Sequence, residues 1–338
     1  MQTHRILQLL PLLLLNFLIS CDSSDIKDSI ELAEGVPRET INADMLGTNS
    51  FLNDNRFGSI DSQLSDVKNN LRLNFVRILF AWTDSVQPSP SASPNYSFYD
   101  SIAGSIPPGM DAIVVLTNVP SWMKDSANWI DGNPRKTFAQ QWVGKTARRY
   151  AGNGRIIGWE IWNEQNMLSN PDNTTLGIAT SPANYTEMLT FAFNEVRAAA
   201  PGKLVLSGPT TAINQNFPET LDYNKGMQEA GALNVCDIWA VHYYGKQFEK
   251  LITDGGVADF LNSFSKEVWV TESGERGVNS QLDYGEHVWH YLKEQVPSIQ
   301  RIYQYQYTEA SGADSTYGLR NLTPGRELSD LYVYLRDR

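Results

Sequence analysis

Short apolar runs alternate along this chain with stretches in which apolar residues recur every three or four positions. The runs have the length and the β-branched and aromatic content typical of buried parallel strands, whereas the periodic stretches are typical of helices that bury one face. Eight runs are predicted as strands: Met45–Phe51, Phe75–Trp82, Ala112–Thr117, a run from Ile156 that leads into Asn163-Glu164, Leu204–Ser207, Ile238–Tyr243, Val268–Thr271 and Arg301–Tyr307.

Helical stretches lie between and after these runs. They are predicted around Leu64–Leu71, over Phe138–Tyr150, from a Ser181 cap and first-turn Pro182 to Gly202, and over Glu286–Glu294 and Glu327–Leu335. Eight strands with interleaved helices in ~290 residues predict a single-domain (β/α)8 TIM barrel rather than a doubly wound sheet. No Gly-rich phosphate loop follows the first strand, which also disfavours a dinucleotide-binding fold.

The N-terminal residues have a different pattern. A basic start at His4 and Arg5 precedes the apolar segment Ile6–Ile19, which is too short and too interrupted to span a bilayer. The segment ends in Leu18-Ile19-Ser20-Cys21, which resembles the lipobox of bacterial lipoproteins. Residues 1–20 are therefore expected to be a lipoprotein signal peptide. A plain secretory signal with a chance cysteine is the alternative.

This assignment divides the chain and gives it a location. Cys21 would carry the lipid, and residues 21–40, which are rich in Asp, Glu and Ser, would form an acidic tether. Residues 41–338 would then be the barrel domain. The protein is expected in the bacterial cell envelope, on the periplasmic or cell-surface side, with membrane contact only through the lipid anchor.

Composition narrows the function. Of 338 residues, 41% are hydrophobic and 19% charged, as in a soluble domain with a large core. The formal net charge of −11 argues against a nucleic-acid partner. With four His and no metal-ligand spacing, neither a metal nor another cofactor is expected. Cys236 has no predicted disulfide partner, and the protein is expected to be a monomer.

The fourth strand ends in a cluster of polar and aromatic residues. Along an extended strand, Glu160, Trp162 and Glu164 should point to one side, and Trp159, Ile161 and Asn163 to the other. A carboxylate at a strand end, beside an amide and aromatic walls, suits proton transfer to a sugar oxygen. The alternative is a surface glutamate after a strand.

The seventh strand ends in a second carboxylate, Glu272, in Trp269-Val270-Thr271-Glu272-Ser273-Gly274. Active sites of TIM barrels lie where the strands end, and strands four and seven face each other across the barrel. Two carboxylates ~5–5.5 Å apart are the arrangement of a retaining glycosidase. The sequence therefore predicts that Glu164 and Glu272 act as a pair on a glycosidic bond of a poly- or oligosaccharide. The net charge of −11 favours a neutral glycan over uronic acids.

The two motifs, Trp-Glu-Ile-Trp-Asn-Glu and Trp-Val-Thr-Glu-Ser-Gly, resemble glycoside hydrolase clan A. Family 39 and its exopolysaccharide-hydrolase relatives are most similar, with family 5 next. The resemblance implies that Glu164 is the acid/base and Glu272 the nucleophile. Two positions depart from the family 39 pattern: Gln165 stands where proline is usual, and Tyr305-Gln306-Tyr307 stands where a tryptophan is frequent.

Other site residues follow from the same resemblance. Arg77, on the second strand, resembles the arginine that keeps the nucleophile ionised, although it could also pair with Glu160. Asn163 would hold the sugar 2-hydroxyl. In His242-Tyr243-Tyr244, Tyr244 would donate to the nucleophile and His242 would line the site, with a core histidine as the alternative.

Two aromatic residues are candidates for contact with the sugar. Trp122, after Pro120-Ser121, is either a sugar platform or a loop anchor. Tyr307, at the end of the eighth predicted strand, is expected to bind substrate.

Two other classes of function remain as alternatives. A sugar-binding barrel lipoprotein that has lost catalysis would normally lack one of the two glutamates, and both are present. An aldolase or isomerase would normally show a Schiff-base lysine or a phosphate-binding loop after strands seven and eight, and the strand ends show neither.

Overall fold

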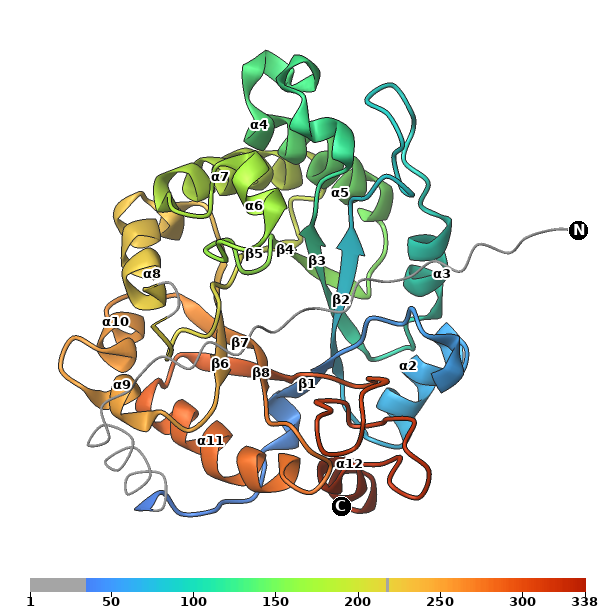
Figure 1. The fold of residues 1–338 in the computed structure, drawn as a ribbon, viewed down its shortest axis with the longest axis vertical. Helices are drawn as coiled ribbons and strands as arrows, with labels where there is room; N and C mark the ends of the chain where they lie inside the picture. Colours follow the sequence, from blue (N-terminus) through green and yellow to red (C-terminus); the bar gives the residue numbers. More distant parts are fainter. Residues whose placement is uncertain (1–34, 217–218) are drawn as a thin grey trace, which may run out of the picture.

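The computed structural model describes residues 35–216 and 219–338 as a barrel of parallel strands surrounded by helices (Figure 1). The strands follow one another in chain order, and β1 pairs with β8 to close the barrel. The strands are β1 (Leu46–Asn49), β2 (Phe75–Ala81), β3 (Asp111–Thr117), β4 (Ile156–Ile161), β5 (Leu204–Ser207), β6 (Ile238–Tyr244), β7 (Glu267–Gly274) and β8 (Ile299–Gln304). The predicted single-domain (β/α)8 barrel is confirmed.

Helices occupy the connections between strands and the end of the chain. They are α2 (Ile60–Asn69), α3 (Ser97–Ser105), α4 (Pro134–Phe138), α5 (Lys145–Tyr150), α6 (Pro171–Leu176), α7 (Pro182–Ala199), α8 (Thr220–Glu229), α9 (Phe248–Ile252), α10 (Val257–Asn262), α11 (Gln281–Gln295) and α12 (Asp330–Asp337). A π-helical segment, Ala139–Gly144, joins α4 to α5. In the described ranges, no helix is both long enough and apolar enough to cross a bilayer.

Two apolar layers hold the barrel. The larger layer lies between strands and helices, and it includes Val76 and Ile78 of β2. The smaller cluster consists of alternate strand residues that point into the barrel: Ile113, Leu206, Ile238, Trp269 and Tyr303. Because side chains alternate along a strand, one strand can contribute to both layers: in β6, Ile238 belongs to the inner cluster and Trp239 to the outer layer.

Polar side chains replace apolar ones toward the C-terminal ends of the strands. Arg77, Glu160 and His242 are each 3% exposed or less, and they follow inward-facing Phe75, Gly158 and Ala240 by two positions. A (β/α)8 barrel carries its active site at this end. The apolar lower layer thus supports a buried, charged upper layer.

The described residues begin within the predicted tether, and the last residues of that tether lie against α11. Val36 is buried, and the Glu39 N–H donates to the Glu286 carbonyl at 2.9 Å. The predicted signal peptide, the lipidation site Cys21 and the tether up to residue 34 lie outside the described residues. The other cysteine, Cys236, is free and buried at 2% exposure.

Candidate active site

A bulge in β7 turns Glu272 toward the barrel axis. The register shifts between Val241 and His242 on β6, so that His242 lies opposite Glu272 and Thr271 is passed over. A one-residue bulge exchanges the inward and outward faces of a strand. Beyond the bulge, the Ser273 hydroxyl points outward and contacts Tyr284 of α11 at 3.0 Å. Glu272 therefore points inward, although strict alternation from Trp269 would turn it outward.

Two donors converge on the Glu272 carboxylate. Arg77 Nη1 donates to Oε1 at 2.5 Å, and the Tyr244 hydroxyl donates to Oε2 at 2.8 Å. The side chain is 9% exposed. Charge-assisted hydrogen bonds of this kind stabilise a carboxylate anion. The predicted contacts of Arg77 and Tyr244 with Glu272 are present.

Arg77 also pairs with Glu160, so the two alternatives for this arginine hold together. Arg77 Nε lies 3.1 Å from Glu160 Oε1, and both side chains are almost fully buried. Asn49 fixes the guanidinium from β1 by accepting from Nη1 at 2.7 Å. A buried charge needs partners that satisfy its donors. Glu160 holds the arginine from below, one residue before the end of β4.

The end of β4 departs from the predicted alternation. Trp162 and Glu164 have positive φ values of 79° and 51°, so the chain leaves the extended conformation after Ile161. The Trp162 ring lies on the helix side, edge-on to Phe138, and its N–H donates to Asn173 at 2.7 Å. The expectation that Trp162 shares the side of Glu164 was therefore wrong. The turn points both Asn163 and Glu164 into the barrel mouth.

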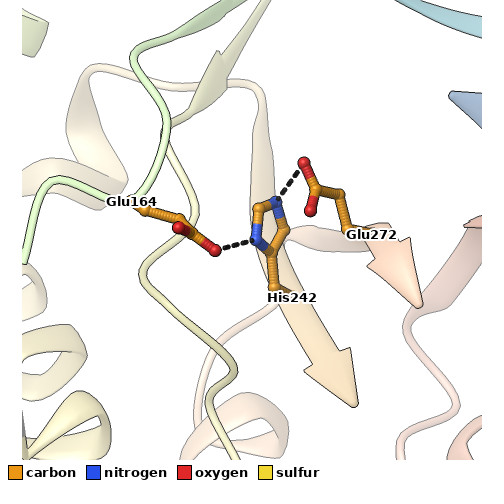
Figure 2. Close-up of side chains that lie close together, drawn as sticks. All are labelled: Glu164, His242 and Glu272. Carbon is orange, nitrogen blue, oxygen red and sulfur yellow. Dashed lines mark hydrogen bonds and ion pairs between the residues drawn. The ribbon is translucent and has the colours of Figure 1, made fainter. Parts of the chain in front are cut away.

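His242 lies between the two glutamates (Figure 2). Its Nδ1 is 3.2 Å from Glu164 Oε1, and its Nε2 is 3.6 Å from Glu272 Oε1. Burial lowers the pKa of this imidazole to about 3, although Glu272 opposes the shift. His242 is therefore neutral at physiological pH and carries one N–H. With that proton on Nε2, the N–H points toward the Glu272 carboxylate. Nδ1 then has a free lone pair and can accept a hydrogen bond from the protonated Glu164 carboxyl.

The two carboxylates are close enough to act on one bond. One oxygen of each and one nitrogen of His242 all lie within 4.8 Å of one another. Inverting glycosidases need ~6.5–9.5 Å between the carboxyl groups to admit a water, and retaining ones need ~5–5.5 Å. The same three residues could ligate a metal ion, but both oxygens of Glu272 already accept from protein donors, Arg77 and Tyr244.

Burial raises the pKa of Glu164 to about 7, and the positive charge of Arg77 opposes this shift. Its side chain remains 19% exposed, so a substrate oxygen can reach it. A carboxyl with this pKa is largely protonated below neutrality, as the acid/base role implied by the resemblance requires.

This pKa gives a prediction for the pH profile. Glu164 can donate a proton only below its pKa, so kcat/KM for a substrate with a poor leaving group should fall as the pH rises through about 7. Initial rates between pH 4 and 9 would measure this limb. A dinitrophenyl glycoside, whose leaving group needs no proton, is the control and should show a weaker limb. An alkaline limb that persists in Glu164→Gln would assign it to another group.

Of the remaining predicted residues, Asn163 lies at the site, whereas Trp122 holds two loops together. Asn163 Oδ1 accepts from Arg77 Nη2 at 2.7 Å, which leaves its amide N–H groups for a ligand. Trp122 donates its indole N–H to the Gln87 carbonyl at 2.9 Å and packs edge-on to Trp82. These contacts anchor the loops after β2 and β3, as in the second of the two alternatives for Trp122.

Tyr307 was placed wrongly. Its side chain is 0% exposed, and its hydroxyl donates to Asp66 of α2 at 2.6 Å. It lies in the layer between barrel and helices and cannot touch a substrate. The error arose because β8 ends at Gln304, before the predicted end, and the alternation is not maintained beyond it.

Three aromatic residues at the site were not predicted. The Tyr305 ring lies 6.2 Å from Tyr244 and 5.9 Å from Phe51, and the Tyr317 ring lies 5.7 Å from both tyrosines. These three side chains and that of Tyr244 are all partly exposed. Gly274 permits this packing, because a Cβ there would lie 2.6 Å from the Tyr305 carbonyl. Aromatic rings beside a reactive carboxylate are typical of sugar-binding sites.

Comparison with solved structures gives three similar barrels. A family 39 glycoside hydrolase from Bacteroides cellulosilyticus is 14% identical, with 89% of this chain and 65% of that chain covered and a TM-score of 0.60. A monomeric β-xylosidase from Caulobacter crescentus is 14% identical, with 89% of this chain and 69% of that chain covered and a TM-score of 0.62. A family 1 β-glucosidase from Thermotoga maritima is 11% identical, with 89% of this chain and 98% of that chain covered and a TM-score of 0.62. At such identities the likeness shows the fold alone. The chain spans just under two thirds of the Bacteroides enzyme.

Sequence comparison identifies the family. No curated protein sequence matches this chain significantly. The sequence model of the family described as cellulase (glycosyl hydrolase family 5) matches residues 39–307, which include both strand-end glutamates. The predicted clan is thus confirmed, although the matching family is the one that the motifs placed second. The chain belongs to glycosyl hydrolase family 5, within glycoside hydrolase clan A.

Proposed function

We propose that this protein hydrolyses a glycosidic bond of a poly- or oligosaccharide with retention of configuration, with Glu272 as nucleophile and Glu164 as acid/base. The observation that carries the proposal is the carboxylate pair, whose nearest oxygens lie within 4.8 Å of each other, with different environments. Glu272 accepts from Arg77 and Tyr244, whereas burial raises the pKa of Glu164. Family membership supports a carbohydrate substrate.

In the first step, Glu272 attacks the anomeric carbon while Glu164 gives its proton to the departing oxygen. The bond from carbon to the leaving oxygen breaks as the bond to Glu272 forms. Arg77 and Tyr244 hold the Glu272 carboxylate in place, so little reorganisation is needed at the moment of attack. The Asn163 amide can donate to the sugar 2-hydroxyl, a contact that strengthens in the transition state.

In the second step, Glu164 acts as base. Having lost its proton, it accepts one from a water molecule, which attacks the anomeric carbon and releases Glu272. Neutral His242, whose Nδ1 lies 3.2 Å from Glu164 Oε1, orients this carboxyl while it is protonated, before the first step and after the second. The two displacements each invert the anomeric centre, and the product therefore has the configuration of the substrate.

Proton NMR of the first product tests this mechanism. The anomeric signal that appears before mutarotation should have the configuration of the substrate. A glycan that the enzyme hydrolyses must first be found by screening. Glu272→Gln, which should not form the product, is the negative control. A first product of inverted configuration would contradict the proposal.

We propose separately that Cys21 is lipidated and anchors the protein in the bacterial cell envelope. The support is the sequence Leu18-Ile19-Ser20-Cys21 after an apolar segment. The wild type should partition into detergent and incorporate labelled palmitate, whereas Cys21→Ala should do neither. Cys236→Ala is the matched control, because this buried cysteine should not affect partitioning. A fully soluble wild type would refute the anchor.

A further inference from the structure

One arginine at the mouth of the barrel lacks a carboxylate partner. In the described ranges, the loops that follow the strands hold four arginines. Three of them, Arg56, Arg320 and Arg326, pair with Asp54, Asp66 and Asp314. The fourth, Arg276, lies four residues after Glu272, and none of the ion pairs of the described residues includes it. A partly buried guanidinium without an internal anion is available to a ligand.

The position of Arg276 is fixed by its neighbours. Its guanidinium carbon lies 5.2 Å from the centre of the Tyr317 ring, and its backbone N–H donates to Glu275 Oε1 at 2.8 Å. The next residue, Gly277, donates its N–H to the Thr316 carbonyl at 2.8 Å, which ties the loop after β7 to the loop after β8. Stacking on an aromatic face leaves the edge of a guanidinium free to form a bidentate pair.

Two carboxylates of these loops accept from the backbone of Arg276 or Tyr317. Glu275 accepts from the backbone N–H of Arg276, and the second carboxylate is already satisfied. Glu309 accepts from the Ser311 hydroxyl at 2.8 Å through one oxygen, and from the Tyr317 N–H at 2.6 Å and the Thr316 hydroxyl at 3.1 Å through the other. It therefore fixes Tyr317 rather than neutralising Arg276. The Arg276 guanidinium therefore stacks on Tyr317 with no ion pair in the described residues.

Arg276 belongs to the side of the site that holds the sugar retained by the enzyme. Glu164 protonates the leaving oxygen, so the leaving group lies toward β4, and the retained part lies toward Glu272. Tyr317 contacts Tyr244, whose hydroxyl bonds to Glu272, so two rings separate Arg276 from the nucleophile. A group at this position would contact the sugar unit next to the one that is attacked.

We infer that Arg276 selects glycans that carry a carboxylate, a uronic acid, on the non-reducing side of the cleaved bond, with Tyr317 as the surface that positions its guanidinium. This inference rests on the proposed hydrolase function and names its substrate class. It differs from the preference for neutral glycans that the net charge of −11 favoured. A net charge acts over the whole surface, whereas one preorganised arginine acts at contact distance.

A panel of defined glycans tests the inference. Glucuronoxylan, homogalacturonan and alginate would be compared with the same polymers after chemical reduction of their carboxylates to alcohols, and with neutral xylan, mannan, cellulose and laminarin. The wild type should hydrolyse at least one uronate polymer. Reduction of its carboxylates should lower kcat/KM by about 10- to 100-fold, the range for a hydrogen-bonded charged pair.

Variants then identify the residue. Arg276→Met should lower kcat/KM on the uronate polymer about 10- to 100-fold and much less on its reduced form, and Arg276→Lys should recover part of the loss. Arg326→Met, which removes an exposed arginine paired with Asp314, is the matched control and should leave both rates unchanged.

The outcomes separate this inference from the proposed function. Hydrolysis restricted to neutral glycans, equal rates on native and reduced polymers, or equal losses on both in Arg276→Met would overturn the role of Arg276 and leave the hydrolase function intact. No reaction with any polymer or with activated aryl glycosides would refute the hydrolase function itself.

Discussion

Glu272→Gly should abolish hydrolysis, with a fall in kcat on the order of 10⁴- to 10⁶-fold, because the group that forms the covalent bond is gone. Azide should restore turnover of an activated aryl glycoside. The small anion can occupy the space that the carboxylate leaves and attack from the same face, so the glycosyl azide product should have inverted configuration. Rates with and without azide, followed by proton NMR of the product, measure both effects.

The variant should remain folded, because Arg77 keeps its pair with Glu160 and its hydrogen bond to Asn49. Thermal unfolding of Glu272→Gly confirms or excludes this. Glu267→Gln, a change of the glutamate at the opposite end of β7, is the matched control and should keep normal activity. Substantial turnover by Glu272→Gly without azide would show that another group is the nucleophile.

Glu164→Ala should behave differently from Glu272→Gly. Loss of a general acid should lower kcat/KM about 10²- to 10⁴-fold for a substrate with a poor leaving group. A dinitrophenyl glycoside should still form the covalent intermediate, because its leaving group departs without a proton. The intermediate should then accumulate, since no base activates water for the second step, and a burst of dinitrophenolate should precede slow turnover.

Azide distinguishes the two glutamates again. With Glu164→Ala it should attack the covalent intermediate from the side that water normally uses, and the glycosyl azide should have retained configuration. Glu160→Gln serves as a comparison, because Glu160 is fully buried beneath Arg77. An inverted azide product from Glu164→Ala would mean that the two roles are exchanged or that the pair is not catalytic.

Much of the barrel could be predicted, because buried parallel strands produce apolar runs and every predicted strand was found. The pairing of Glu164 and Glu272 was also predictable, since it requires only that strands four and seven end at the same face. The directions of individual side chains at the strand ends were not. A bulge at Thr271 and positive φ values at Trp162 and Glu164 break the two-residue period there, and the period was the basis of those predictions.

The aromatic residues show the same limit. Phe51 and Tyr305 follow β1 and β8 directly and could have been found by inspecting every strand end. Tyr317 lies in a long loop after β8, and hydrogen bonds with Glu309, Gln304 and Gln306 bring it back to the site. Such tertiary contacts leave no periodic signal in the sequence. Tyr307 was chosen instead because the predicted eighth strand extended too far.

The central claim is that Glu272 forms the covalent intermediate, and labelling tests it most directly. A dinitrophenyl 2-deoxy-2-fluoro glycoside of the configuration that the enzyme hydrolyses should form a long-lived adduct with the wild type, because fluorine slows the second step. Peptide mass spectrometry should then place one sugar on Glu272, and Glu272→Gln should take up none. A label on Glu164, Glu160 or any other residue, with Glu272 unmodified, would contradict the account.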